Sequence, residues 1–78
     1  MNIEALRLLH QTRPFVPFTM CLADGRKLYV KHNEYLAVAP TGGLAVLTHD
    51  HGRFTMIDTR LIVTADQGDL SEPKTSKA

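Results

Sequence analysis

The chain has 78 residues, 44% of them hydrophobic, and a formal net charge of +1 at pH 7. This length corresponds to one small domain and leaves no room for a second core. A charge of +1 lacks the overall basic bias of dedicated nucleic-acid binders, although a local basic patch can suffice, and the single cysteine, Cys21, excludes a disulfide within the chain.

A short amphipathic helix is predicted over residues 3–12. Asn2 is a suitable N-cap, because its side-chain oxygen can accept a hydrogen bond from a free backbone N–H of the first turn. Pro14 ends the helix, since it biases the preceding residue away from helical geometry. The apolar stripe of this helix consists of Ile3, Leu6, Leu8 and Leu9. A helix this short is not stable alone, so the stripe must pack on the rest of the domain.

The apolar spacing changes from 3.6 to 2 at Phe18, after an extended connector that contains Pro14 and Pro17. A two-residue Asp-Gly loop would put the apolar residues of the first two strands on opposite faces. A three-residue loop at 23–25, with a left-handed Gly25, instead pairs Met20 with Leu28 and Phe18 with Val30. The predicted inward set is therefore Phe18, Met20, Leu22, Leu28 and Val30, while Thr19 and Cys21 point outward.

Four further strands are predicted at residues 35–39, 44–49, 53–57 and 61–65, separated by a bend at 32–34, turns at 40–43 and 50–52, and a break at 58–60. The polar stretch 66–78 reads as a disordered tail, so the domain spans 1–65. The fold class is α+β: an N-terminal helix followed by an antiparallel β-meander of five to six strands, either a small SH3-like or Sm-like barrel or a strongly bent sheet.

The later strands are apolar on both faces. Ala45, Leu47 and Ile57 alternate with a second apolar set made of Leu44, Val46, Phe54 and Met56. One face can fill the core, and the other needs the helix or a second subunit to cover it. The pattern therefore indicates self-association or a protein partner.

A basic and aromatic stripe lies on the outward face of the second strand, with Lys27, Tyr29 and Lys31 at alternate positions after Arg26. Cations for phosphates and a ring for base stacking are what a nucleic-acid surface needs. The same pattern is also typical of an ordinary solvated strand on which lysine protects an edge.

Three histidines, His32, His49 and His51, could contribute to a metal site, because alternating imidazoles with a nearby carboxylate can bind a metal ion. No spacing supplies the four ligands of a structural site, and a polar hairpin tip explains His49 and His51 equally well. No catalytic residue, nucleophile or cofactor motif stands out, and Gly42-Gly43 lacks the lysine of a phosphate loop.

Two resemblances follow from the spacing of particular residues. The pattern Arg13-Pro14-Phe15-x-Pro17-Phe18, Asp24-Gly25-Arg26, Val30-x-His32-x-Glu34, Val38-x-Pro40 and Ile57-Asp58 resembles a group of short uncharacterised bacterial proteins, which implies no activity. More loosely, the helix followed by Pro17, Met20, Leu22, Gly25 and Leu28 is similar to the Sm-like fold, including the RNA chaperone Hfq, whose members form rings and bind RNA. Asp58-Thr59-Arg60 stands where that family has its pore-lining Tyr-Lys-His-Ala type segment.

Three functions are compatible with these features, and we favour the first, a non-enzymatic binding or self-assembling module. The second is a nucleic-acid binder that uses Arg26, Lys27, Tyr29 and Lys31. The third is a metal-dependent or hydrolytic enzyme that uses the three histidines. The first residues lack the basic start and long apolar run of a signal peptide, no apolar run is long enough to span a bilayer, and the lone cysteine fits a reducing compartment, so we expect a cytoplasmic protein without membrane contact.

Overall fold

The computed structural model describes residues 2–69, which form one helix, six strands and three short 3-10 helices. The helix and strands are α1 (Ile3–Gln11), β1 (Phe18–Leu22), β2 (Lys27–Val30), β3 (Leu36–Val38), β4 (Leu44–Thr48), β5 (Phe54–Asp58) and β6 (Ile62–Gln67). The 3-10 helices are η1 (Asn33–Tyr35), η2 (Asp50–Gly52) and η3 (Thr59–Leu61).

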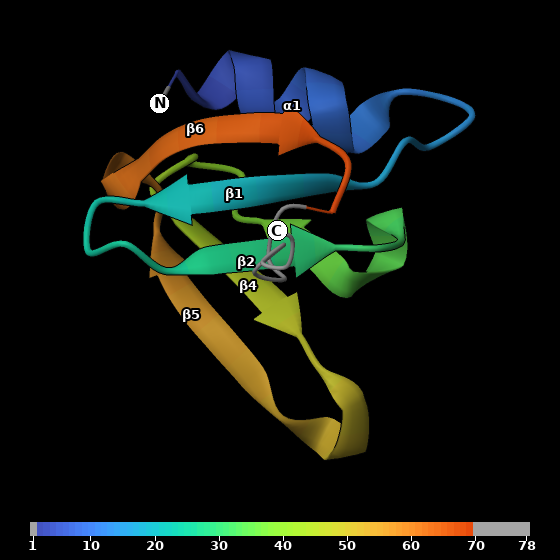
Figure 1. Cartoon of the computed structure of the whole chain (residues 1–78). Helices are drawn as coiled ribbons and strands as arrows, with labels where there is room; N and C mark the ends of the chain where they lie inside the picture. The colour runs from blue at the N-terminus through green and yellow to red at the C-terminus, as the bar shows by residue number, and fades with distance from the viewer. Residues whose placement is uncertain (1, 70–78) are drawn as a thin grey trace, which may run out of the picture.

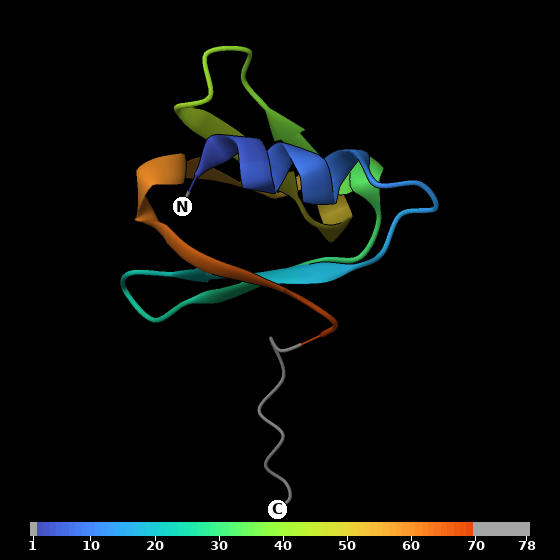
Figure 2. The same cartoon turned by 90° about the horizontal axis from the view of Figure 1, so that it is seen from above.

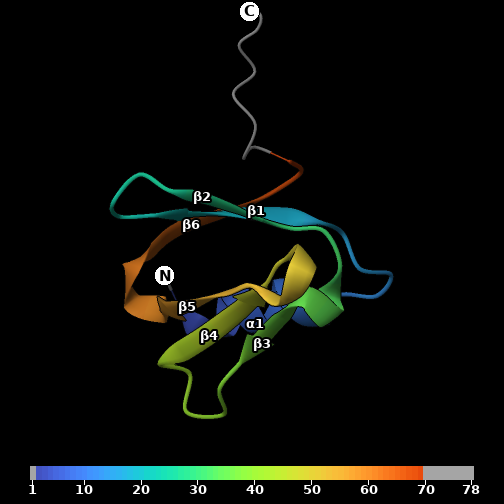
Figure 3. The same cartoon turned by 90° about the horizontal axis from the view of Figure 1, so that it is seen from below.

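The strands form two antiparallel three-stranded sheets, with the orders β2-β1-β6 and β3-β4-β5. Figure 1 shows the first sheet in front and the β4–β5 hairpin running obliquely behind it, and Figure 3 shows the two sheets as stacked layers. Among residues 2–69 no strand ladder joins the two sheets. The predicted α+β class is confirmed, in the form of a strongly bent sheet and not of a closed barrel.

The β1–β2 hairpin has the predicted register. Phe18 pairs with Val30 and Met20 with Leu28. The loop between them has three residues, because the Leu22 N–H donates to the Arg26 carbonyl at 2.9 Å, and Gly25 is left-handed with φ 94°. Leu28 is half-buried against the core, and the other four residues of the predicted inward set are buried.

The core lies between the two layers, and α1 lies across the opening at one side of them (Figure 2). Leu6 is fully buried, with Ile3 and Leu9 packed beside it. Leu8 is 69% exposed, so its predicted place in the buried stripe is wrong. At about 3.6 residues per turn, the two positions from Leu6 to Leu8 correspond to a rotation of about 200°, which puts Leu8 on the opposite side of the helix axis from Leu6.

Three features of the fold differ from the predictions. The 3-10 turn η1 overlaps the predicted bend at 32–34 and includes Tyr35, and the third strand is shortened to Leu36–Val38. β6 continues to Gln67, beyond the predicted end at residue 65, because Asp66 and Gln67 pair with β1. Thr19, predicted on the outward face of the first strand, is fully buried, and its hydroxyl donates to the Gly68 carbonyl at 2.7 Å. The rest of the predicted tail, residues 70–78, lies outside the described residues.

The turn between β3 and β4 joins the start of the domain to its end. Arg7 of α1 donates to the carbonyls of Ala39 and Pro40 at 3.1 and 3.0 Å. From the other side, the Thr59 hydroxyl of η3 donates to the Gly42 carbonyl at 2.6 Å. Gly42 has φ 85°, and a Cβ built on it would lie 3.1 Å from Cγ1 of Ile3. The residue at this position must therefore be both left-handed and without a side chain.

Asp58 caps η3 at the point where the chain crosses from one sheet to the other. Its carboxylate accepts from the Arg60 backbone N–H at 3.0 Å and from the Arg60 guanidinium at 2.8 Å. These hydrogen bonds lower the pKa of Asp58 from 3.8 to about 2. Arg60 thus stabilises the ionised carboxylate of Asp58 at the connection between β5 and β6.

Replacing glycine by alanine at three turns should give graded losses of stability. Gly25→Ala forces a left-handed alanine into open space, and we expect a loss of about 1 kcal/mol. Gly42→Ala adds a close contact with Ile3, and we expect about 2 kcal/mol or more. Gly43, whose φ is not positive and whose Cβ position is open, is the matched control and should change little. Urea unfolding checks this order, and equal losses at all three sites would contradict it.

Neutralising Asp58 should change how stability depends on pH. Because its folded pKa of about 2 lies below the usual 3.8, the ionised carboxylate stabilises the folded state near neutral pH. This contribution is lost as the pH falls from about 4 to about 2. We expect Asp58→Asn to be less stable than the parent chain at pH 7 and nearly equal to it at pH 2. Thermal unfolding at several pH values measures the difference, with Asp50→Asn as the control for net charge; a difference that does not vary with pH would contradict the prediction.

Candidate functional site

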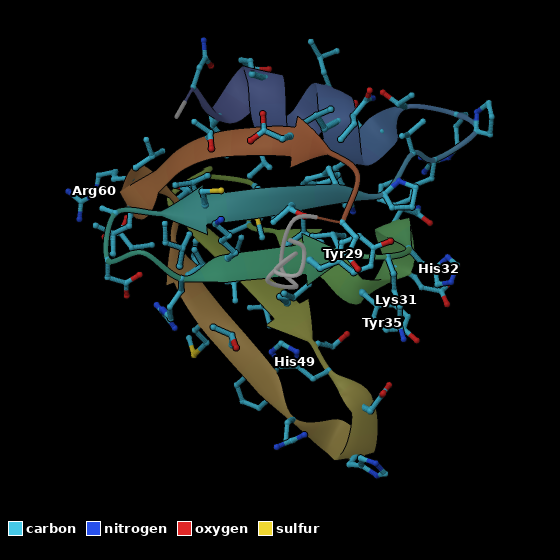
Figure 4. The ribbon with its side chains drawn as sticks, viewed as in Figure 1. Tyr29, Lys31, His32, Tyr35, His49 and Arg60 are labelled. Atoms are coloured by element: carbon cyan, nitrogen blue, oxygen red, sulfur yellow. The ribbon has the colours of Figure 1, made fainter. Side chains whose placement is uncertain are left out.

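A cleft is lined by residues of β2, of the turn η1 and of the outer end of the β4–β5 hairpin. This end of the hairpin extends beyond the first sheet (Figure 1). The volume of the cleft is about 310 Å³, at the lower end of the range of ligand pockets. The residues that line it are polar or aromatic: Tyr29, Lys31, Tyr35, Thr48, His49, Asp50 and Arg53. Figure 4 shows Tyr29, Lys31, Tyr35 and His49 around this space, contributed by separate segments of the chain.

The β1–β2 register and the turn η1 position one wall of the cleft. Because Phe18 pairs with Val30, both Tyr29 and the following Lys31 point away from the core. Tyr35, at the end of η1, brings its ring to 5.3 Å from the Lys31 ammonium, a cation–π distance. The Thr48 hydroxyl donates to the Tyr35 carbonyl at 3.2 Å, which ties this wall to β4.

The tip of the β4–β5 hairpin forms the opposite wall. The His49 N–H donates to the Arg53 carbonyl at 2.7 Å and closes a three-residue loop, as the sequence predicts for 50–52. His51 has φ 65° and Gly52 has φ 76°, so both are left-handed, and Gly52 takes the same last position of its loop as Gly25 in the first hairpin. In this exposed part of the hairpin, the His49 Nε2 lies 2.7 Å from the Thr55 hydroxyl, and this hydrogen bond fixes the ring against β5.

The structure divides the four residues predicted to bind nucleic acid. Tyr29 and Lys31 line the cleft. Lys27 stands on the same strand outside it, and Arg26 is held in the hairpin loop by an ion pair with Asp24 at 2.9 Å. The hydrogen bond from the Arg26 backbone N–H, together with this ion pair, lowers the pKa of Asp24 below its usual value. Only two of the four residues therefore line the cleft.

Sequence reasoning did not predict that Tyr35 and Arg53 line the same cleft as Tyr29. Each stands at the end of a turn, and nothing in its spacing reports which other turn it approaches. The sequence suggests for His49 a metal ligand, a residue of a hydrolytic site or a polar hairpin tip, and the structure places it in the lining of the cleft.

The three histidines are not gathered into a metal site. Figure 4 shows His32 beside η1 and His49 at the hairpin, on different sides of Tyr35. The His32 ring instead contacts the Tyr35 ring, with centroids 5.7 Å apart. Within residues 2–69 there is no group of three or more His, Cys, Asp or Glu side chains that could hold a metal ion.

A second surface carries exposed apolar side chains on strands at the sheet edges. On β5, Phe54 and Met56 are 60% and 61% exposed. On β6 and the preceding turn, Val63 and Leu61 are 61% and 47% exposed. The helix does not cover them, so the second apolar face predicted for the later strands is open to solvent in the single chain.

Within residues 2–69, no helix has the length and apolar character needed to cross a membrane. No family model, curated protein or solved structure matches the chain. The two resemblances noted from the sequence therefore stay predictions, and the arguments about function below start from the geometry of this chain alone.

Proposed function

We propose that this chain is a non-enzymatic self-assembling module in which the β5 edge of one copy pairs with the β6 edge of the next. One observation carries the proposal: the two longer edge strands, which contain no lysine, arginine or proline and only one aspartate each, are also the ones that expose large apolar side chains. The contact would bury those side chains and satisfy the unpaired backbone groups of both strands.

The four sheet edges differ in how they resist pairing with another strand. β2 carries Lys27 and is followed by Lys31, and lysine on an edge strand opposes pairing. β3 has only three residues, too few for a strong ladder. β5 and β6 have five and six residues and contain no lysine, arginine or proline. The composition of the edges therefore favours contacts through β5 and β6.

Between two copies of the chain, a head-to-tail contact of β5 with β6 fits these edges better than a symmetrical contact of β5 with β5 does. A β5–β5 contact would cover Phe54 and Met56 and leave the exposed Val63 uncovered. A head-to-tail contact from β5 to β6 covers both edges in every copy. It would also join β3-β4-β5 of one copy to β6-β1-β2 of the next as a continuous six-stranded sheet. Such head-to-tail contacts generate a ring when the rotation closes and a filament when it does not.

The proposal predicts a particle larger than a dimer. Size-exclusion chromatography with light scattering should give a mass of three or more times the 8.7 kDa of the chain. Met56→Lys should shift the protein toward the monomer, because it puts a charge on the pairing edge. Leu8→Lys is the matched control, since Leu8 is equally exposed but lies on α1. A monomeric parent chain, or equal dissociation by both variants, would overturn the proposal.

Cysteine cross-linking distinguishes head-to-tail pairing from a symmetrical contact. In a Cys21→Ser background, the double variant Met56→Cys, Val63→Cys should give a ladder of covalent oligomers with a short bismaleimide. Each single variant should stay monomeric on a denaturing gel, because its cysteine meets no second cysteine across a β5–β6 contact. Dimers from Met56→Cys alone would instead reveal β5–β5 pairing and contradict the head-to-tail arrangement.

A further inference from the structure

The cleft between β2 and the β4–β5 hairpin holds polar side chains that the fold itself does not use. Among residues 2–69, the side chains of Tyr29, Asp50 and Arg53 make no hydrogen bond or ion pair with the rest of the chain, and all three line the cleft. Polar groups that converge on one pocket without internal partners are available to a ligand.

Arg53 differs in this respect from the other four arginines of the chain. Arg7 and Arg13 donate to backbone carbonyls. Arg26 and Arg60 are paired with the aspartates two residues before them. Arg53 alone among the five has neither kind of partner within residues 2–69, and its guanidinium stands beside the cleft that Lys31 also lines. Two cations at one small cleft, opposite a single carboxylate, favour an anionic ligand.

The aromatic residues of the cleft divide into one that is engaged and one that is available. The Tyr35 ring is already in contact with Lys31 and His32, so it holds the ammonium in place. Tyr29 is half-buried and has no ring contact within the described residues, which leaves its ring for a planar ligand group. None of the lining residues is alanine, valine, leucine, isoleucine or methionine, so the only aliphatic surface comes from the stems of Lys31 and Arg53 and the methyl group of Thr48. An aliphatic ligand would therefore find little surface to pack against.

We propose that this cleft binds a nucleotide unit, that is, an aromatic base that carries a ribose and a phosphate. The base stacks on Tyr29, as bases do on exposed aromatic side chains. The phosphate lies between Lys31 and Arg53, which supply charge-assisted hydrogen bonds. Asp50 accepts hydrogen bonds from the ribose hydroxyls or from an amino group of the base. The volume of about 310 Å³ suits one such unit.

This site does not depend on the proposed assembly, because none of its lining residues belongs to the exposed apolar set of β5 and β6. The unit could come from a free nucleotide or from a single-stranded nucleic acid, since both present the same base, ribose and phosphate. Binding to a strand adds further phosphate contacts and hence a steep dependence on salt.

The test is a titration of the ¹⁵N-labelled chain with adenosine monophosphate, adenosine, inorganic phosphate and a short oligoadenylate. The chemical shifts of the backbone amide signals report binding. We expect saturable shifts of the cleft residues with the monophosphate, and binding of adenosine or phosphate alone that is at least about tenfold weaker. Tighter, salt-dependent binding of the oligomer identifies a nucleic-acid strand as the source, and equal affinity identifies the free nucleotide. No saturable shift up to about 10 mM of any of the four would overturn the proposal.

Variants separate the cleft from the rest of the basic surface. Lys31→Ala, Arg53→Ala and Tyr29→Ala should each weaken binding of the monophosphate about tenfold. Tyr29→Phe should keep most of the affinity, because the stacking ring remains. Lys27→Ala and Arg26→Ala remove the same charges outside the cleft and should change affinity less than about twofold. If the control variants lost as much affinity as Lys31→Ala does, binding would reflect general charge attraction, and the proposed site would be wrong.

Discussion

The register of the β1–β2 hairpin is the constraint on which the rest of the structure depends. With Gly25 left-handed in a three-residue loop, Phe18, Met20 and Val30 all face the core. Every outward side chain of β2 follows from that choice, because strand side chains alternate strictly. A slip of one residue would turn Tyr29 inward and expose Val30, and the cleft would lose both its stacking ring and its core support.

The parts of the fold that sequence reasoning predicted are those in which neighbouring residues carry the signal. The hairpin register, the helix and its Asn2 cap, and the loop at 50–52 follow from local periodicity and turn chemistry. The exposure of Leu8 also follows from helical geometry, because two positions put it about 200° from the buried Leu6. The burial of Thr19 does not follow from local pattern, because it depends on a distant part of the chain. Thr19 is partnered by the Gly68 carbonyl, in a stretch that looks like an unstructured polar tail.

The candidate cleft was only half predictable for the same reason. Tyr29 and Lys31 stand out in the sequence because they alternate on a strand. Tyr35 and Arg53 join them only because the bent sheet brings η1 and the β4–β5 hairpin to the same place. Conversely, Arg26 looks like part of the stripe, but its guanidinium forms an ion pair with Asp24, two residues before it. Composition reports which chemical groups are present, and the bend of the sheet decides which of them can act together.

The β3–β4 turn has a consequence for the order in which the domain can be completed. Its hydrogen bonds with Arg7 join residues 32 and 33 positions apart, and its bond with Thr59 spans 17 positions. Contacts so distant in sequence close late, because the entropy of the intervening chain opposes them. During synthesis from the N-terminus, the helix and the first hairpin emerge well before Thr59 does. The last two strands therefore take their places only on a body that has already formed, so the exposed apolar side chains of β5 and β6 are the last to be presented.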